Sequence, residues 1–145
     1  NLGVCPEKQW PYDFSKFKEK PTQECYDKAK KRVVTEVTHL KPTLEELKAC
    51  LASNLPFVFG IMVHSSFESE AVSKTGKVPL PKKDEKKLGG HALLCCGYDD
   101  DQQVFICRNS WSSKWGDRGY CYIPFDYLTN PEIAWDFWCV KKTSR

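Results

Sequence analysis

Residues 90–111 read GHALLCCGYDDDQQVFICRNSW, two apolar runs separated by a short acidic segment. Each run, residues 92–98 and residues 104–108, has the length and composition of a short buried strand. The segment between them is rich in Asp, a residue that favours turns. The stretch therefore predicts a β-hairpin. Because adjacent strands lie about 4.8 Å apart, this hairpin can bring His91 and Asn109 together.

The segment before the hairpin predicts a helix with a defined start. Thr43 and Glu46 have the spacing of a capping box, in which Thr43 caps the amide of Glu46 and the Glu46 carboxylate reaches back to the N-cap amide. The leucines that follow recur at helical spacing. We expect a helix over residues 43–53, ended by Asn54.

Other apolar or β-branched runs predict further strands, at residues 33–40, 56–63, 119–123 and 137–140. Short strands with one capped helix define an α+β class with a mainly antiparallel sheet or partial barrel. The first twenty or so residues contain turn-forming residues and show no regular repeat of apolar positions, which indicates an extended surface segment. We find no internal repeat and expect no second domain within this fragment.

The composition fits one globular domain and excludes several classes of function. The 145 residues carry 22 Lys and Arg against 19 Asp and Glu and are 41% hydrophobic. Between residues 74 and 88, six lysines stand against two acidic residues, so we expect a solvated loop there. Without interleaved aromatic residues this run does not predict nucleic-acid binding. No apolar run approaches the roughly 18 to 20 residues of a membrane helix.

The eight cysteines do not predict a metal site. No Cys-x-x-Cys pair is present, and the nearest cluster is His91, Cys95 and Cys96. On a strand, neighbouring residues point to opposite faces, so one ion cannot collect all three side chains. We expect no metal and no cofactor. The first residues lack an initiator Met and the pattern of a signal peptide, so we expect a piece of a longer chain.

Several motifs together resemble the papain-like cysteine peptidases of the C1 type. A His-Ala pair opens an apolar strand that ends in Gly-Tyr (residues 91–98), and Asn-Ser-Trp follows at 109–111. Next comes Trp-Gly-x-x-Gly-Tyr at 115–120, while Trp-Pro-Tyr at 10–12 matches an upstream segment of the family. The Gly-Val-Cys-Pro of residues 3–6 is more similar to bacterial members than to the plant archetype.

The resemblance implies the papain-like fold with only its β-rich lobe present. Residues 1–32 would be an interlobe segment with a helical stretch, and residues 33–145 would be the β-rich lobe that carries His91 and Asn109. In the family, the nucleophilic Cys lies in the other, helical lobe within a Gly-Ser-Cys-Trp-like motif. That motif does not occur in these 145 residues. The nucleophile is therefore expected outside this sequence.

The resemblance assigns roles to four residues. His91 would stabilise a thiolate as imidazolium and later protonate the leaving amine. Asn109 would accept a hydrogen bond from the other ring nitrogen and fix the orientation of the ring, as in the Cys-His-Asn variant of the catalytic triad. Trp111 would shield that hydrogen bond from water, and Trp115 would support the cleft by packing. The competing interpretation is a structural histidine beside a packed turn.

Cys25 superficially copies the missing site. It follows Gln23 and precedes an aromatic residue at the predicted start of a helix, where the helix dipole lowers the pKa of a thiol. No Gly-rich turn precedes it, and the family register places it where relatives carry a disulfide cysteine. Three alternatives to a nucleophile stay open: a bridge to the absent lobe, a bridge to Cys5, or a buried free thiol.

The resemblance also indicates a pocket for the second substrate residue before the cleaved bond. Its candidates in this sequence are Gly60, Ala92 and Trp135. A small wall opposite a bulky floor would favour a medium-sized apolar side chain.

The implied function is peptide-bond hydrolysis by an endopeptidase that works through a thioester, with this chain inactive alone. Its partners would be a peptide or protein substrate, the Cys-bearing lobe or upstream chain, and a propeptide. Neither nucleic acid nor a membrane is expected, and the resemblance suggests a secreted or lysosome- or vacuole-like location. One alternative is a non-catalytic half-peptidase that binds peptides or proteins. Another is an acyltransferase on the same scaffold.

Overall fold

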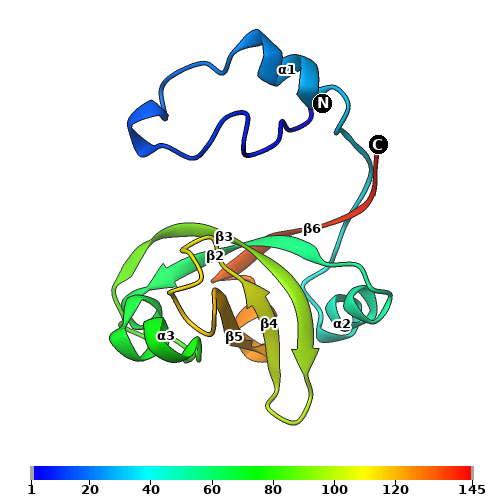
Figure 1. Ribbon diagram of the computed structural model, residues 1–145. Coiled ribbons are helices and arrows are strands. Elements are labelled where there is room, and N and C mark those ends of the chain that lie inside the picture. Colours follow the sequence, from blue (N-terminus) through cyan, green and yellow to red (C-terminus); the bar gives the residue numbers. More distant parts are fainter. Residues whose placement is uncertain (1, 145) are drawn as a thin grey trace. The chain divides into compact units, whose positions relative to one another are not determined.

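The computed structural model describes residues 2–144 and has an α+β fold built on a six-stranded sheet (Figure 1). The sheet order is β1-β6-β2-β3-β4-β5. The strands are β1 Val34–His39, β2 Phe57–His64, β3 Lys87–Asp99, β4 Val104–Arg108, β5 Tyr120–Pro124 and β6 Ala134–Thr143. This confirms the predicted class. In the part of the chain that is described, no helix is long and apolar enough to cross a membrane.

The chain divides into two compact units. One unit is Thr38–Cys139, and the other joins the residues up to Val37 to those from Val140 onward. The last residues group with the N-terminal segment because Ser144 exchanges hydrogen bonds with the backbone of Val33. The sequence-based division instead placed residues 33–145 together.

The larger unit is organised around β2. Alternate residues of this strand, among them Phe57, Phe59 and Ile61, are buried. β2 pairs antiparallel with β3 on one side and with β6 on the other, and β3 continues into the predicted hairpin with β4. The register places Ile61 opposite His91, so the central core strand determines where that histidine lies.

The helices are short: α1 is Gln23–Ala29, α2 Leu44–Ala52, α3 Glu70–Thr75 and α4 Phe125–Leu128, and the 3-10 turns are η1 Phe14–Lys16 and η2 Ser65–Glu68. Figure 1 shows α2 near the start of β2 and α3 beyond its end.

The predicted start of α2 is confirmed, because the Thr43 hydroxyl accepts a hydrogen bond from the Glu46 amide at 3.3 Å. The Glu46 carboxylate, however, accepts the amide of Lys41 and not that of Thr43.

More than one helix is capped, contrary to the sequence-based expectation. The Ser69 hydroxyl accepts the amide of Val72 and so caps α3 in the same way that Thr43 caps α2. The short helix α3 was not predicted, because its sequence has too few apolar residues to show a helical repeat.

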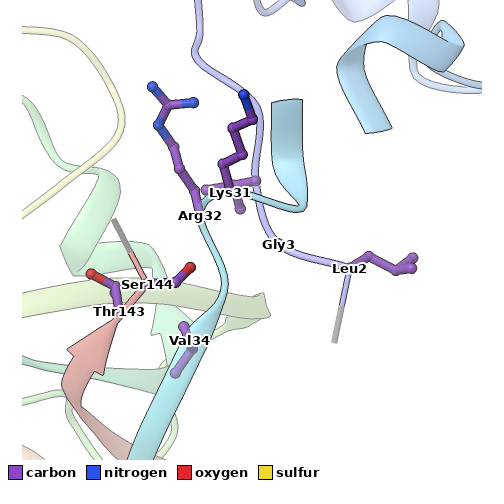
Figure 2. A pocket seen from close by; sticks show the side chains of 8 residues that line it. Leu2, Gly3, Lys31, Arg32, Val34, Thr143 and Ser144 are labelled. Atoms are coloured by element: carbon purple, nitrogen blue, oxygen red, sulfur yellow. The ribbon is translucent and has the colours of Figure 1, made fainter. Parts of the chain in front are cut away.

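The smaller unit has little core. Its N-terminal segment is irregular apart from η1 and α1, and among its described residues only Cys25 and Ala29 are buried apolar residues. A cavity of about 800 Å³ is lined by residues from both of its chain segments, with the side chains of Lys31 and Arg32 extending in the same direction (Figure 2).

The Lys-rich segment is solvated along its lysines, as expected, and is also anchored by its backbone. Its lysine side chains are exposed, but Val78 is buried and its amide donates to the carbonyl of Tyr122 at 3.0 Å. Further along, the carboxylate of Glu85 accepts hydrogen bonds from the amide of Ser66 and from the amide of Lys82. Lysine composition marked the exposed side chains correctly but did not indicate these backbone contacts.

Glu85→Gln should lower the free energy of unfolding by about 1 kcal/mol near neutral pH, because a charged acceptor of several hydrogen bonds is lost. The hydrogen bonds from Ser66, with those from Lys82 and Ser65, lower the pKa of Glu85 from 4.5 to about 2. A pKa lowered by folding stabilises the protein above the unfolded-state value. The difference between variant and wild type should therefore shrink as the pH falls from 4.5 to about 2.

Chemical denaturation at a series of pH values measures this effect. Asp84→Asn is the matched control, because Asp84 is an exposed neighbour on the same segment. A stability difference for Glu85→Gln that stays constant down to the lowest pH would contradict the role of the carboxylate.

Candidate active site

The structure brings His91 and Asn109 into direct contact. His91 lies in β3, and Asn109 directly follows β4, which ends with Arg108 opposite Leu94. The amide of Asn109 donates to the carbonyl of Gly119 at 2.9 Å, which holds this turn in place. Nε2 of His91 lies 2.8 Å from Oδ1 of Asn109, and the Asn109 side chain is 8% exposed.

The hydrogen bonds around Asn109 determine the tautomer of His91. Oδ1 of Asn109 also accepts the backbone amide of Ser110 at 2.8 Å. An amide N–H can only donate, so the atom facing it must be the oxygen, and that oxygen can only accept from the ring. Nε2 of His91 therefore carries a hydrogen. Nδ1 remains available to exchange a proton with a second group.

Aromatic rings enclose this pair. Trp111 stacks on the imidazole of His91 with ring centroids 4.9 Å apart and an interplanar angle of 27°. Trp115 meets Trp111 edge to face at 5.2 Å. Phe67 of η2, which is 1% exposed, stacks on Trp115 and contacts both Trp111 and His91 edge-on. Phe67 was not among the predicted site residues, and its only signal in the sequence is an isolated aromatic residue after a core strand.

The three candidate pocket residues lie in one row across the sheet. Gly60 of β2 pairs with Ala92 of β3 on one side and with Trp135 of β6 on the other. The Trp135 indole packs over Gly60, since a Cβ added there would lie 3.0 Å from the indole Nε1. A separate small cavity of about 110 Å³ adjoins His91 and includes Glu68 and Trp111 in its lining.

Cys25 lies in α1 of the smaller unit, whereas His91 and Asn109 belong to the larger unit. Its thiol is 3% exposed and lies 3.3 Å from the hydroxyl of Thr22, the N-cap of α1. The thiol also donates to the carbonyl of Gln9 at 3.8 Å, and Cys25 lines a small cavity together with Cys5. These contacts are those of a packed thiol beside a second thiol.

The donor groups do not form a metal centre within residues 2–144. No group of three or more His, Cys, Asp or Glu side chains there is arranged to hold an ion. The chemistry that the site can perform is proton transfer at Nδ1 of His91.

A sequence model described as "Papain family cysteine protease" matches residues 1–135. The chain belongs to the papain family of cysteine proteases, as the motifs predicted.

Individual relatives agree with this assignment. The peptidase C1-like protein L477 of Acanthamoeba polyphaga mimivirus is 41% identical, over 98% of this chain and 48% of its own length. The crystal structure of xylellain, a cysteine protease from Xylella fastidiosa, superimposes with a TM-score of 0.88 at 40% identity, over 98% of this chain and 57% of that one. This chain thus spans about half the length of these two relatives.

Asn109→Ala should allow the neutral imidazole of His91 to adopt both tautomers. Nitrogen-15 NMR of the neutral imidazole should show the Nε2–H form in the wild type and a mixture in the variant, because the acceptor that fixes the hydrogen is gone. His64 is the internal control: its Nδ1 lies 3.1 Å from the carbonyl of Met62, so its tautomer should be Nδ1–H in both proteins. A His91 spectrum unchanged by the substitution would contradict the orienting role.

Proposed function

We propose that this chain supplies the His/Asn half of a cysteine endopeptidase that hydrolyses peptide bonds through a thioester. His91 is the general base and acid, Asn109 orients it, and Trp111 and Trp115 shield and support the pair. The nucleophilic Cys lies in a segment outside these 145 residues, and this chain alone is inactive. The observation that carries the proposal is the 2.8 Å contact between Nε2 of His91 and Oδ1 of Asn109.

Two features of the site support a missing catalytic partner. The hydrogen on Nε2 leaves Nδ1 of His91 as the atom that would face a thiol. In addition, Nδ2 of Asn109 is buried and has no hydrogen-bond partner among the described residues. Buried polar atoms are nearly always paired, so an acceptor contributed from outside this segment would complete the site.

The proposed chemistry uses each group of the site. Nδ1 of His91 takes the thiol proton, and the resulting imidazolium stabilises the thiolate. After the thiolate attacks the peptide carbonyl, the imidazolium donates its proton to the leaving amine and a thioester remains. The neutral imidazole then removes a proton from water, which hydrolyses the thioester. Asn109 holds the ring in one orientation through both transfers, and the aromatic rings keep water from the Nε2 hydrogen bond.

The row formed by Gly60, Ala92 and Trp135 supports a proposed substrate pocket. Trp135 is 40% exposed, so its indole offers apolar surface beside two residues with little or no side chain. We propose that this row receives a medium-sized apolar side chain of the substrate. The substrate is then a peptide or protein segment.

An epoxide probe selective for papain-like thiolates tests the proposal on the full-length protein. Mapping the label by mass spectrometry should place it on a cysteine outside residues 1–145. Labelling of Cys25 would overturn the assignment of the nucleophile. Absence of any label, together with absence of peptide cleavage, would favour the non-catalytic binding module.

His91→Ala in the full-length enzyme should lower kcat/KM for a peptide substrate by ~10³-fold or more, because both proton transfers lose their carrier. Thermal unfolding should stay nearly unchanged. His39→Ala is the matched control, since His39 lies on the edge strand β1 and contacts Trp138, so its replacement should leave kcat/KM unaltered. Retained cleavage by His91→Ala would exclude His91 as the catalytic imidazole.

A further inference from the structure

Two cysteines of the smaller unit share one small cavity. Cys5 lies in the irregular N-terminal segment and is half-buried, whereas Cys25 lies in α1 and is 3% exposed. Both line a cavity of about 180 Å³, together with residues such as Pro21 and Tyr26. The interaction between the two thiols raises the pKa of Cys5. The two cysteines are thus neighbours in space although twenty positions separate them in the sequence.

Backbone contacts hold both thiols in place. The amide of Val4 donates to the carbonyl of Arg32 at 3.1 Å, which fixes the segment next to Cys5. Gly3 has a φ of +71°, and a Cβ there would lie 2.0 Å from the carbonyl oxygen of Ala29. Only glycine permits this close approach of the segment to the end of α1. The meeting of the two thiols is therefore built into the local fold.

This unit is also the part of the chain that a covalent link would stabilise most. Its described residues include only Cys25 and Ala29 as buried apolar residues, while Tyr12, Phe14 and Phe17 between the two cysteines are exposed. Small units with so little core usually depend on a disulfide, a metal or a partner. A bond between residues 5 and 25 would close the irregular loop and restrict its unfolded conformations.

We propose that Cys5 and Cys25 form a disulfide when the protein meets a small-molecule disulfide such as oxidised glutathione. Cys5, the more exposed thiol, loses its proton and attacks one sulfur of the oxidant, which releases one thiol and leaves a mixed disulfide. The thiolate of Cys25 then attacks the sulfur of Cys5 and displaces the second thiol. Two protein thiols are oxidised, one oxidant disulfide is reduced, and both protons end on the released thiols.

The electrostatics of Cys5 predict how this step depends on pH. Partial burial raises the pKa of the Cys5 thiol, and the hydrogen bond with Cys25 raises it further. Little thiolate is then present near neutral pH, and the first attack should accelerate as the pH rises.

The larger unit contains an internal control. Cys95, Cys107 and Cys121 stand directly opposite one another on β3, β4 and β5, and all three are fully buried. Burial raises the pKa of Cys107 well above its usual range and that of Cys121 to about 12. These three residues are direct neighbours across the sheet, but a dissolved oxidant cannot reach their thiols. Proximity without access should leave them reduced.

The experiment starts from the fully reduced, full-length protein, incubated with oxidised glutathione under native conditions. The remaining thiols are alkylated after denaturation, and the peptides are mapped by mass spectrometry. We expect one cross-linked pair joining the peptides of Cys5 and Cys25, with Cys95, Cys107 and Cys121 alkylated. Alkylation of both Cys5 and Cys25, separate glutathione adducts at equilibrium, or pairing of Cys25 with another cysteine would overturn the proposal.

Limited trypsin digestion provides a second measurement. Exposed lysines between the two cysteines should be cut several-fold more slowly in the oxidised protein, because the closed loop opens less. Cys5→Ser should abolish this protection. Cys96→Ser, which removes an exposed cysteine of the larger unit, should retain it. Equal digestion of the oxidised and reduced wild type would overturn the stabilising role even if the cross-link forms.

Discussion

The antiparallel register of β2, β3 and β4 is the constraint on which the site depends. β2 buries alternate aromatic and aliphatic residues, and its pairing with β3 places His91 opposite Ile61. A shift of one residue would turn Leu93 and Cys95 out of the core and reverse the facing of every side chain in β3. The large free energy gained by burying the core therefore keeps the strands in this register. The register in turn keeps His91 within hydrogen-bond distance of Asn109. The aromatic rings add further rigidity, each pair contributing about 0.5–1.5 kcal/mol beyond burial.

Local patterns predicted the elements whose signals are local. The apolar runs on either side of three aspartates predicted the β3–β4 hairpin, and Thr43 predicted the start of α2. Family motifs predicted the contact of His91 with Asn109, which spacing alone only permitted. Phe67 contributes to the site by packing against segments far apart in sequence. A local hydrophobic period does not predict such a contact. The anchoring of the Lys-rich segment was missed for the same reason, because Glu85 acts on a turn twenty residues earlier.

Cys25 shows how a local pattern can imitate a site. Its helix start and neighbouring Gln reproduce the surroundings of a nucleophilic thiol, and the predicted helix is present. The local sequence does not show which groups surround Cys25 in the folded chain. There, the thiol of Cys5 and the carbonyl oxygen of Gln9 lie next to it. A catalytic assignment for a thiol therefore needs the positions of its partners as well as its own sequence context.

The row of buried thiols across β3, β4 and β5 has a consequence for the unfolded chain. While the sheet is intact these sulfur atoms are inaccessible, but unfolding releases them together with the other cysteines. Eight thiols can pair completely in on the order of 100 ways, and a pair that joins one of these three cysteines to a distant one prevents the sheet from re-forming. Under oxidising conditions heat inactivation would then be irreversible, and the useful lifetime of the protein would be determined by its unfolding rate and not by its equilibrium stability.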